Sequence, residues 1–574
     1  MTQSEPEPKR RRTADPDQVK ALHSKWFPKR VHTSSVVPRH PLGVKPSGNL
    51  LLASHDSEYL DKSQRMGFWT LLASNEQLMM TILQFIDSPL DLMKLGHTSR
   101  VMYAYTWNEE LWRHLYMRKA SKSVESHYPL GIKEWKGSWR RTLLGIESDQ
   151  EALIQVKENQ ICSDFLYRPY QCSQIDYSEI CREIIQDEQV YHDRPEAYSK
   201  HNSLKGHVIR IPEDQITLEN FENNYTDLPF IITNPNRSRW PSWSMESLLE
   251  RFANVQFRQE SVRWPLSFYS EYSRDNCDES PLYLFDCNSD AMKELVNEVT
   301  VPNCFKKDLF TVFDDNDILC RPDHTWLIMG PKNSGSTFHK DPNFTSAWNT
   351  AISGRKLWIM LPPDIKPPGI GTDKTESEVT APVGIAEWTL SGFMQDALNL
   401  TKFDQCLVGI TYPGECMHVP AGWWHSVINL DNSIAMTGNF IPEPKLPYAL
   451  DFVKNKNNQI SGFHSLDVKK SLINICKRMN QDTERYQKFQ DYIREAKDDN
   501  EDCGEITFVP MPIYDMFLEL LEQSKEFNSI DLNNVVARLA SIQKKNLPAK
   551  VRESKTWNQL VSQNGFSFGF SEDD

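Results

Sequence analysis

The hydrophobic positions recur at helical spacing near the N-terminus and at strand spacing in the centre of the chain. The run Ser74-Asn75-Glu76-Gln77 has a capping-box pattern, which predicts a helix with Ser74 as its N-cap. A second helix is expected to begin at Ser88-Pro89, because serine caps helices and proline suits their first position. A third is marked by the apolar residues Trp107, Leu111, Trp112 and Leu115. We therefore expect a compact three-helix unit within 66–120.

From about residue 206 the pattern changes to short runs rich in β-branched and aromatic residues, separated by Gly, Pro and Asn. Strands are expected at 208–212, 228–233, 282–285, 326–329, 357–361 and 433–437. Many short strands of this kind predict a double-sheet jelly roll, also called a double-stranded β-helix or cupin barrel. After about residue 445 the helical spacing returns, for example at 468–478 and 513–522.

These patterns predict an α+β multidomain protein. The expected division is a basic tail (1–65), the helical unit (66–120), a helical connector (121–205), the barrel (206–445), a helical C-terminal region (446–565) and an acidic tail (566–574). The 574 residues agree with about four units at ~150 residues each. Since 39% of them are hydrophobic, the chain can build real cores, which excludes wholesale disorder.

Charge is distributed unevenly along the chain. The net charge of −14 argues against coating nucleic acid or an anionic membrane, although a local basic patch stays possible, so direct nucleic-acid binding is left open. The first 50 residues hold 10 Lys and Arg against 4 Asp and Glu, and Lys9-Arg10-Arg11-Arg12 is their densest cluster. That cluster predicts either a nuclear-import signal or a solvated tail. We expect a nuclear protein, with the cytoplasm as a further location.

The sequence also bears on membrane targeting and on the role of the cysteines. The chain has no apolar run of 18 residues and no apolar segment at its start, so we expect neither a membrane span nor a secretory signal. Its 11 cysteines include no CxxC pair, so neither a disulfide framework nor a structural zinc site is predicted.

One constellation carries candidate chemistry. His339 and Asp341 are two residues apart, so on a strand both side chains would point to the same face. His425 opens another apolar strand and could supply a third ligand. Two histidines and one carboxylate form the facial triad of non-haem Fe(II) oxygenases. The spacing alone is weak evidence, because an HxD pattern also arises by chance and His425 could be a structural histidine.

The surrounding sequence resembles the Jumonji-C (JmjC) family of Fe(II)- and 2-oxoglutarate-dependent oxygenases, in its phosphatidylserine-receptor-like lysyl hydroxylase branch. The matching runs lie at 280–286, 345–349, 354–358, 413–425 and 429–440. The resemblance implies a cupin barrel with iron, 2-oxoglutarate as co-substrate and O2, and His339, Asp341 and His425 as the catalytic metal ligands.

The same resemblance implies the residues that hold the co-substrate. Lys356 would bind the distal carboxylate of 2-oxoglutarate, and a lysine opening an apolar strand does need an anionic partner. Tyr283 and Thr437 would add hydroxyl groups, with Asn349 and Asn439 near the co-substrate and iron. The branch usually has threonine three residues before the first histidine. This chain has Ser336 there and Thr337 next to it, so which hydroxyl contributes is open.

The helical unit resembles an F-box. The resemblance runs through the positions Leu78, Ile82, Leu83, Ile86, Pro89, Leu92, Ser99, Arg100, Leu111 and Trp112. It implies docking on Skp1 and a link to a cullin ubiquitin ligase; the alternative is an ordinary helical packing module.

Together these features predict a 2-oxoglutarate-dependent dioxygenase that hydroxylates a lysine or similar side chain of a protein, which could be basic or histone-like. The alternatives are an N-methyl lysine or arginine demethylase and an F-box substrate adaptor of a ubiquitin ligase. The neighbouring Trp423 and Trp424 could form an aromatic cage for methylated lysine, but packing beside the metal strand is the favoured interpretation.

Overall fold

The computed structural model describes residues 75–542 with gaps at 122–131, 133, 152, 155, 157–163, 194–205, 316, 374–375, 377–378, 381–383, 404 and 497–509, and also His40 and Leu42. The basic cluster at 9–12 and the acidic tail lie outside these residues, so nuclear import stays a prediction. Within the described ranges, no helix has both the length and the apolar composition needed to cross a bilayer.

The N-terminal helical unit contains four helices rather than the three expected: α6 (Glu76–Gln84), α7 (Pro89–Gly96), α8 (Arg100–Thr106) and α9 (Glu109–Ser121). The side chain of Asn75 caps α6 by accepting from the Leu78 amide, so the prediction of Ser74 as N-cap was wrong by one residue. Ser88 caps α7 as predicted. The missed helix α8 is capped by Ser99, and all its residues from Met102 to Thr106 are buried, so it lacks an amphipathic period.

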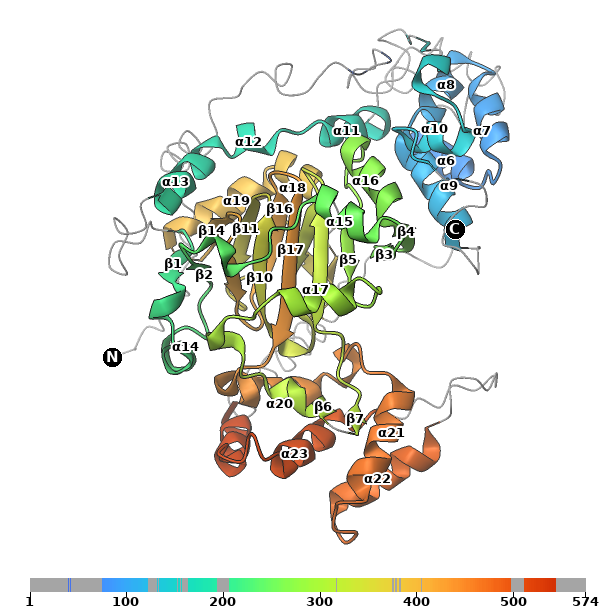
Figure 1. Cartoon of the computed structure of the whole chain (residues 1–574). Coiled ribbons are helices and arrows are strands. Elements are labelled where there is room, and N and C mark those ends of the chain that lie inside the picture. Colours follow the sequence, from blue (N-terminus) through green and yellow to red (C-terminus); the bar gives the residue numbers. More distant parts are fainter. Residues whose placement is uncertain are drawn as a thin grey trace, which may run out of the picture.

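A helical connector joins this unit to the barrel. It comprises α10 (Trp139–Leu144), capped by Ser138, and then α11 (Asp164–Ser173), α12 (Tyr177–Ile180) and α13 (Arg182–Asp193), which run across the top of the barrel in Figure 1. Buried ion pairs fasten α13 to the sheet edge. Glu188 pairs with Arg210 at 2.9 Å and with His207, and Arg210 pairs with Glu415 at 3.1 Å. These charges satisfy one another away from water, which is the condition for burying them.

Two β-sheets form the predicted jelly roll (Figure 1). The nine-stranded sheet has the order β1 (Ile209–Pro212), β2 (Phe230–Thr233), β15 (Cys416–Val419), β10 (Ser346–Ser353), β17 (Ser433–Phe440), β8 (Thr325–Gly330), β5 (Leu284–Asp286), β3 (Gln256–Gln259) and β4 (Val262–Pro265). The four-stranded sheet has the order β14 (Leu407–Thr411), β11 (Lys356–Leu361), β16 (Trp424–Asn429) and β9 (Gly335–His339).

Strand alternation divides each sheet into an inner and an outer face. On β11, Trp358 and Met360 join the core inside the barrel, whereas Leu357, Ile359 and Leu361 pack outward. The outward set packs with α18 (Ile385–Leu390) and α19 (Phe393–Asn399). Lys356 therefore projects inward from the same strand. The same alternation on β10 and β17 places Asn349, Thr437 and Asn439 inside.

Helices cover the remaining surfaces of the barrel. The outer face of the nine-stranded sheet shares its core with α14 (Leu218–Asn224), α15 (Met245–Phe252), α16 (Leu266–Asp275) and α17 (Met292–Glu298). The C-terminal helices α20 (Leu446–Asn455), α21 (Ser465–Cys476), α22 (Glu484–Glu495) and α23 (Ile513–Gln523) build a separate core with the hairpin β6 (Asp314–Asp315) and β7 (Ile318–Leu319). A small hairpin, β12 (Gly371–Thr372) and β13 (Val379–Thr380), completes the sheets.

The helical unit and the barrel share one hydrophobic core. Tyr116 of α9 lies with its ring centroid 5.9 Å from Trp264 of β4 and 5.0 Å from Trp139 of α10. Trp139 in turn lies 5.7 Å from Tyr272 of α16. All four rings are buried. The helical unit is therefore packed against the barrel through aromatic side chains rather than held by a linker alone.

Candidate active site

A cavity of about 540 Å³ opens between the two sheets of the barrel. All nine candidate site residues line it: Tyr283, Ser336, His339, Asp341, Asn349, Lys356, His425, Thr437 and Asn439. They come from five strands and two adjoining loops that are far apart in the sequence. The jelly roll thus brings every residue that the resemblance implied to a single cavity.

His339, Asp341 and His425 form the one metal-binding cluster found in the described part of the chain, with their ligand atoms all within 4.8 Å of one another. His339 ends β9, and Asp341 begins the turn that follows it. His425 lies opposite His339 on β16. The expectation that His339 and Asp341 both belong to a strand is therefore met only for His339, although the extended backbone of Asp341 keeps the two side chains together.

The chemistry of these donors fits a divalent metal. Nδ1 of His339 lies 2.8 Å from the Thr337 carbonyl, and Nδ1 of His425 lies 3.2 Å from the Trp423 carbonyl. Because a carbonyl only accepts, each Nδ1 carries the proton and each Nε2 keeps its lone pair. Oδ2 of Asp341 is buried without a hydrogen-bond partner, and burial raises the pKa of this carboxyl. Burial likewise lowers the pKa of His425, which keeps the imidazole neutral for metal binding.

Lys356 is a buried cation without a carboxylate partner. The residue is only 1% exposed, and its Nζ atom donates to the Tyr283 hydroxyl at 2.7 Å. Among the described residues, no carboxylate oxygen comes within ion-pair distance of Lys356. Burial lowers the pKa of this ammonium to about 7. An anionic group in the cavity would restore the charge, so the position suits the distal carboxylate of a 2-oxo acid.

A β-bulge explains how Ser336 enters the site. Residues three apart on a regular strand face opposite sides. Here the pairing shifts, so that His339 lies opposite His425 and Ser336 opposite Val427. His425 and Val427 share the inner face of β16, and Ser336 is therefore turned inward with His339. Thr337 also lines the cavity and is exposed, so both residues border it.

Asn349, Thr437 and Asn439 have different hydrogen-bonding states. The Oδ1 atom of Asn349 is buried and without a partner, so it is available inside the cavity. The Thr437 hydroxyl donates to the Trp348 carbonyl at 2.7 Å, so in this arrangement its proton is not available to a carboxylate. Asn439 donates to Thr345 at 2.8 Å and also hydrogen-bonds Asp341, which makes it a support for a metal ligand.

Sequence reasoning missed several residues at the cavity. Asn429 pairs with Lys356 in the strand register and hydrogen-bonds Tyr283, so it supports the lysine and tyrosine pair. Its place at the end of the strand that carries His425 was the available signal. The wall of the cavity itself includes Arg258, Glu260, Ser280 and Phe285, from the β3–β4 hairpin and the segment leading through β5, but not Asn429. Trp424 is fully buried in the outer core, which confirms packing rather than an aromatic cage for that ring.

Comparison with known proteins agrees with this geometry. Residues 185–445 match the model of the cupin-like domain family. The chain is 31% identical over 431 residues to the arginine-specific demethylase JMJ22 of Arabidopsis thaliana, covering 73% of this chain and 77% of that protein. It is 29% identical to the lysine-specific demethylase JMJ21 of the same plant, covering 64% of this chain and 36% of that protein.

A third relative is the bifunctional arginine demethylase and lysyl-hydroxylase psr-1 of Caenorhabditis elegans, 33% identical over 250 residues, with 41% of this chain and 61% of that protein covered. The similarity to JMJ22 extends over most of both chains, and a further relative, JMJD4 of Mus musculus, is named as a 2-oxoglutarate and iron-dependent oxygenase. With its barrel, its cavity and its His, Asp, His cluster, this chain belongs to the JmjC family of Fe(II)- and 2-oxoglutarate-dependent oxygenases.

Proposed function

We propose that this oxygenase hydroxylates the side chain of a lysine, or of a similar basic residue, in a protein substrate. The observation that carries the proposal is the composition of the cavity outside the metal cluster. Glu260 and Phe285 line it, and both are exposed. A carboxylate and an aromatic ring that line one cavity suit a long side chain with an apolar stem and a cationic end, and Glu260 also lies 3.6 Å from the Arg113 guanidinium. The net charge of the protein, −14, likewise favours a basic partner.

The residues of the chain have separate tasks in this proposal. His339, Asp341 and His425 would hold Fe(II), and Lys356 with Tyr283 would bind the distal end of 2-oxoglutarate. Bound iron and 2-oxoglutarate supply the O2-dependent chemistry that puts an oxygen atom on a substrate carbon. The barrel orients the reactants and excludes bulk water from the cavity. Asn439 and the backbone carbonyls of Thr337 and Trp423 keep the ligands in place.

The alternative is removal of an N-methyl group from lysine or arginine. It uses the same site, because hydroxylation of an N-methyl carbon yields an unstable product that releases formaldehyde. The names of JMJ22, JMJ21 and psr-1 favour this alternative as a second activity. Mass spectrometry separates the two reactions: a hydroxylated peptide gains one oxygen atom, whereas a demethylated peptide loses the mass of one methylene.

The decisive experiment incubates nuclear proteins with the purified enzyme, Fe(II), ascorbate and 2-oxoglutarate. We expect a set of lysine-containing peptides to gain one oxygen, and the same peptides to stay unmodified with the His339→Ala variant. Exclusive loss of methyl groups would replace the proposal with demethylation. Modification of neither kind, from an enzyme that still converts 2-oxoglutarate to succinate, would contradict both.

We further propose that the helical unit binds Skp1 and so couples the oxygenase to a cullin complex. The support is the exposure of large apolar side chains on α6, the loop after it and α7, where Leu78, Phe85 and Leu90 are 44%, 78% and 56% exposed. Several large apolar side chains left exposed in adjacent elements favour a protein partner. A pure adaptor role, in which the barrel only recognises substrates, is the second candidate function here.

The Skp1 proposal predicts that Phe85→Asp combined with Leu90→Asp reduces binding to purified Skp1 by more than about a hundredfold, since truncating interface anchors costs ~2 kcal/mol or more each. Binding is measured by biolayer interferometry. Leu466→Asp, which places the same charge on a comparably exposed leucine of α21, serves as the matched control and should bind normally. Undetectable binding by the unmodified protein would remove the coupling and the adaptor role together.

A further inference from the structure

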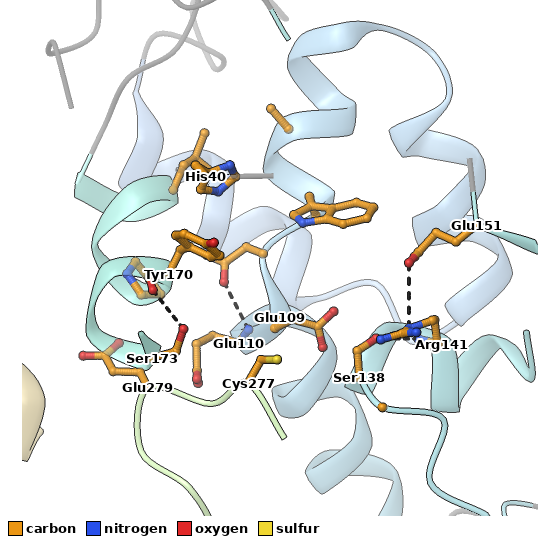
Figure 2. A pocket seen from close by; sticks show the side chains of 16 residues that line it. His40, Glu109, Glu110, Ser138, Arg141, Glu151, Tyr170, Ser173, Cys277 and Glu279 are labelled. Atoms are coloured by element: carbon orange, nitrogen blue, oxygen red, sulfur yellow. Dashed lines mark hydrogen bonds and ion pairs between the residues drawn. The ribbon is translucent and has the colours of Figure 1, made fainter. Parts of the chain in front are cut away.

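The segment 277–283 lies between the helical unit and the active-site cavity. Cys277 and Glu279 line a second cavity, of about 180 Å³, where the helical unit and the connector meet the barrel. Figure 2 shows their side chains around this cavity together with Glu109 and Glu110 of α9. Ser280 and Tyr283, only a few residues further on, line the active-site cavity. The first residues of this segment therefore face the helical unit, and the residues that follow them face the active-site cavity.

Arg113 of α9 holds this segment. Its Nη1 atom donates to the Ser280 carbonyl at 2.7 Å and lies 3.6 Å from the Asp278 carboxylate. Its Nη2 atom lies 3.6 Å from the carboxylate of Glu260, at the tip of the β3–β4 hairpin. The arginine side chain is only 14% exposed. A single guanidinium from the helical unit thus contacts two residues that line the active-site cavity, Ser280 and Glu260, and the buried acid beside them.

Asp278 gives this contact a rigid anchor. Its carboxylate is 2% exposed and accepts from Trp139 Nε1 at 2.7 Å and from the Tyr272 hydroxyl at 2.6 Å. The same Tyr272 hydroxyl accepts from the Leu282 amide at 2.7 Å. The segment is therefore fastened at Asp278, Ser280 and Leu282.

The next residue after this fastened stretch is Tyr283, whose hydroxyl accepts from Lys356 at 2.7 Å. The backbone amide of Tyr283 also hydrogen-bonds the Glu260 carboxylate that faces Arg113. Two routes of direct contact therefore join Arg113 to Tyr283: one through the backbone of the segment and one through Glu260.

We infer that Arg113 is a positioning residue for the end of the active site that binds 2-oxoglutarate. Through Arg113, the helical unit helps to keep the co-substrate site in its binding geometry. The planar guanidinium presents several donors at fixed angles, so it can hold Ser280, Asp278 and Glu260 in one arrangement, which a lysine cannot reproduce. A binding site keeps its geometry only when the residues behind it are themselves held, and Tyr283 is held in this way. The inference rests on the JmjC family chemistry, not on the identity of the protein substrate.

The test compares Arg113→Met with Arg118→Met. Arg118 lies on the same helix, but its guanidinium pairs with Asp87 and donates to the carbonyls of Gln84 and Ile86, all within the helical unit. We expect Arg113→Met to weaken 2-oxoglutarate binding to the Mn(II)-loaded protein about tenfold, a typical coupling between neighbouring groups. Hydrogen exchange at residues 278–286 should rise in parallel. Arg118→Met should leave both readouts at their starting values. Calorimetry and hydrogen exchange measure them without turnover or protein substrate.

A third variant covers the case in which Arg113→Met leaves Asp278 too poorly compensated to fold. Arg113→Lys keeps the charge, and we expect it to restore part of the affinity and part of the exchange protection. A folded Arg113→Lys or Arg113→Met protein with unchanged 2-oxoglutarate affinity and unchanged exchange at 278–286 would overturn the inference. An equal loss of affinity in Arg118→Met would also overturn it, since the effect would then follow general destabilisation of the helical unit. Failure to find a lysine substrate affects neither readout.

Discussion

Replacement of His339 by alanine should reduce 2-oxoglutarate turnover by more than about a hundredfold, because changes to groups that merely support a metal ligand already cost about ten- to a hundredfold. His339 supplies one of three ligand atoms within 4.8 Å of one another, and the remaining Asp341 and His425 would leave the metal weakly held. Succinate release followed by NMR reports turnover. Quenching of tryptophan fluorescence by Mn(II) reports metal binding separately.

The matched control for this prediction is His464→Ala. His464 is exposed in the C-terminal region, ahead of α21, so its loss should change neither succinate release nor metal binding. A His339→Ala protein that turns over 2-oxoglutarate at the unmodified rate would disprove the assignment of the triad, whatever its substrate.

Replacement of Lys356 by methionine should weaken 2-oxoglutarate binding about thirtyfold or more, since truncating one partner of a buried charge pair costs ~2 kcal/mol or above. The methionine keeps the apolar stem but cannot meet a carboxylate or donate to Tyr283. Isothermal titration with the Mn(II)-loaded protein measures the dissociation constant. Lys332→Met is the matched control: it removes an exposed lysine of the loop before β9 that pairs with Asp176 at 3.6 Å, outside the cavity.

The buried lysine also predicts how binding depends on pH. Without ligand the pKa of Lys356 is about 7, and a bound carboxylate raises it. Below pH 7 the ammonium is already charged, so this group adds no pH dependence. Above pH 7 the lysine must take up a proton on binding, and the affinity should fall as the pH rises. Titrations in buffers of different ionisation enthalpy measure that proton uptake, which Lys356→Met should abolish. Equal affinity at pH 7 and about pH 9 would contradict this account.

The sequence allowed the central elements to be predicted because each followed a local rule. Strands such as β11 are short and mostly apolar, and Ser88 caps its helix as its hydroxyl group suggested. The prediction failed where two local signals compete or where burial is complete. Ser74 and Asn75 are both acceptable caps and only the backbone decides between them, and α8 is too buried to show a helical period.

The site was predictable as a set of residues but not as a geometry. The HxD pattern and the family resemblance named the ligands, yet the inward turn of Ser336 depends on a bulge that arises from pairing with a strand about 90 residues away. Long-range contacts of this kind carry no local signature. The same reason hid Asn429 beside Lys356 and Arg113 beside Ser280, since each depends on which strands and helices become neighbours.

The aromatic core shared by α9, α10, β4 and α16 bears on how this protein can be divided for study. A fragment that starts at the first strand of the barrel would expose the faces of Trp264 and Tyr272 that Tyr116 and Trp139 now cover. Losing the cover of buried aromatic rings costs several kcal/mol, a large share of the stability of an ordinary domain. Such a fragment should aggregate, and fragments for crystallography or enzymology should begin ahead of α6 and keep the connector.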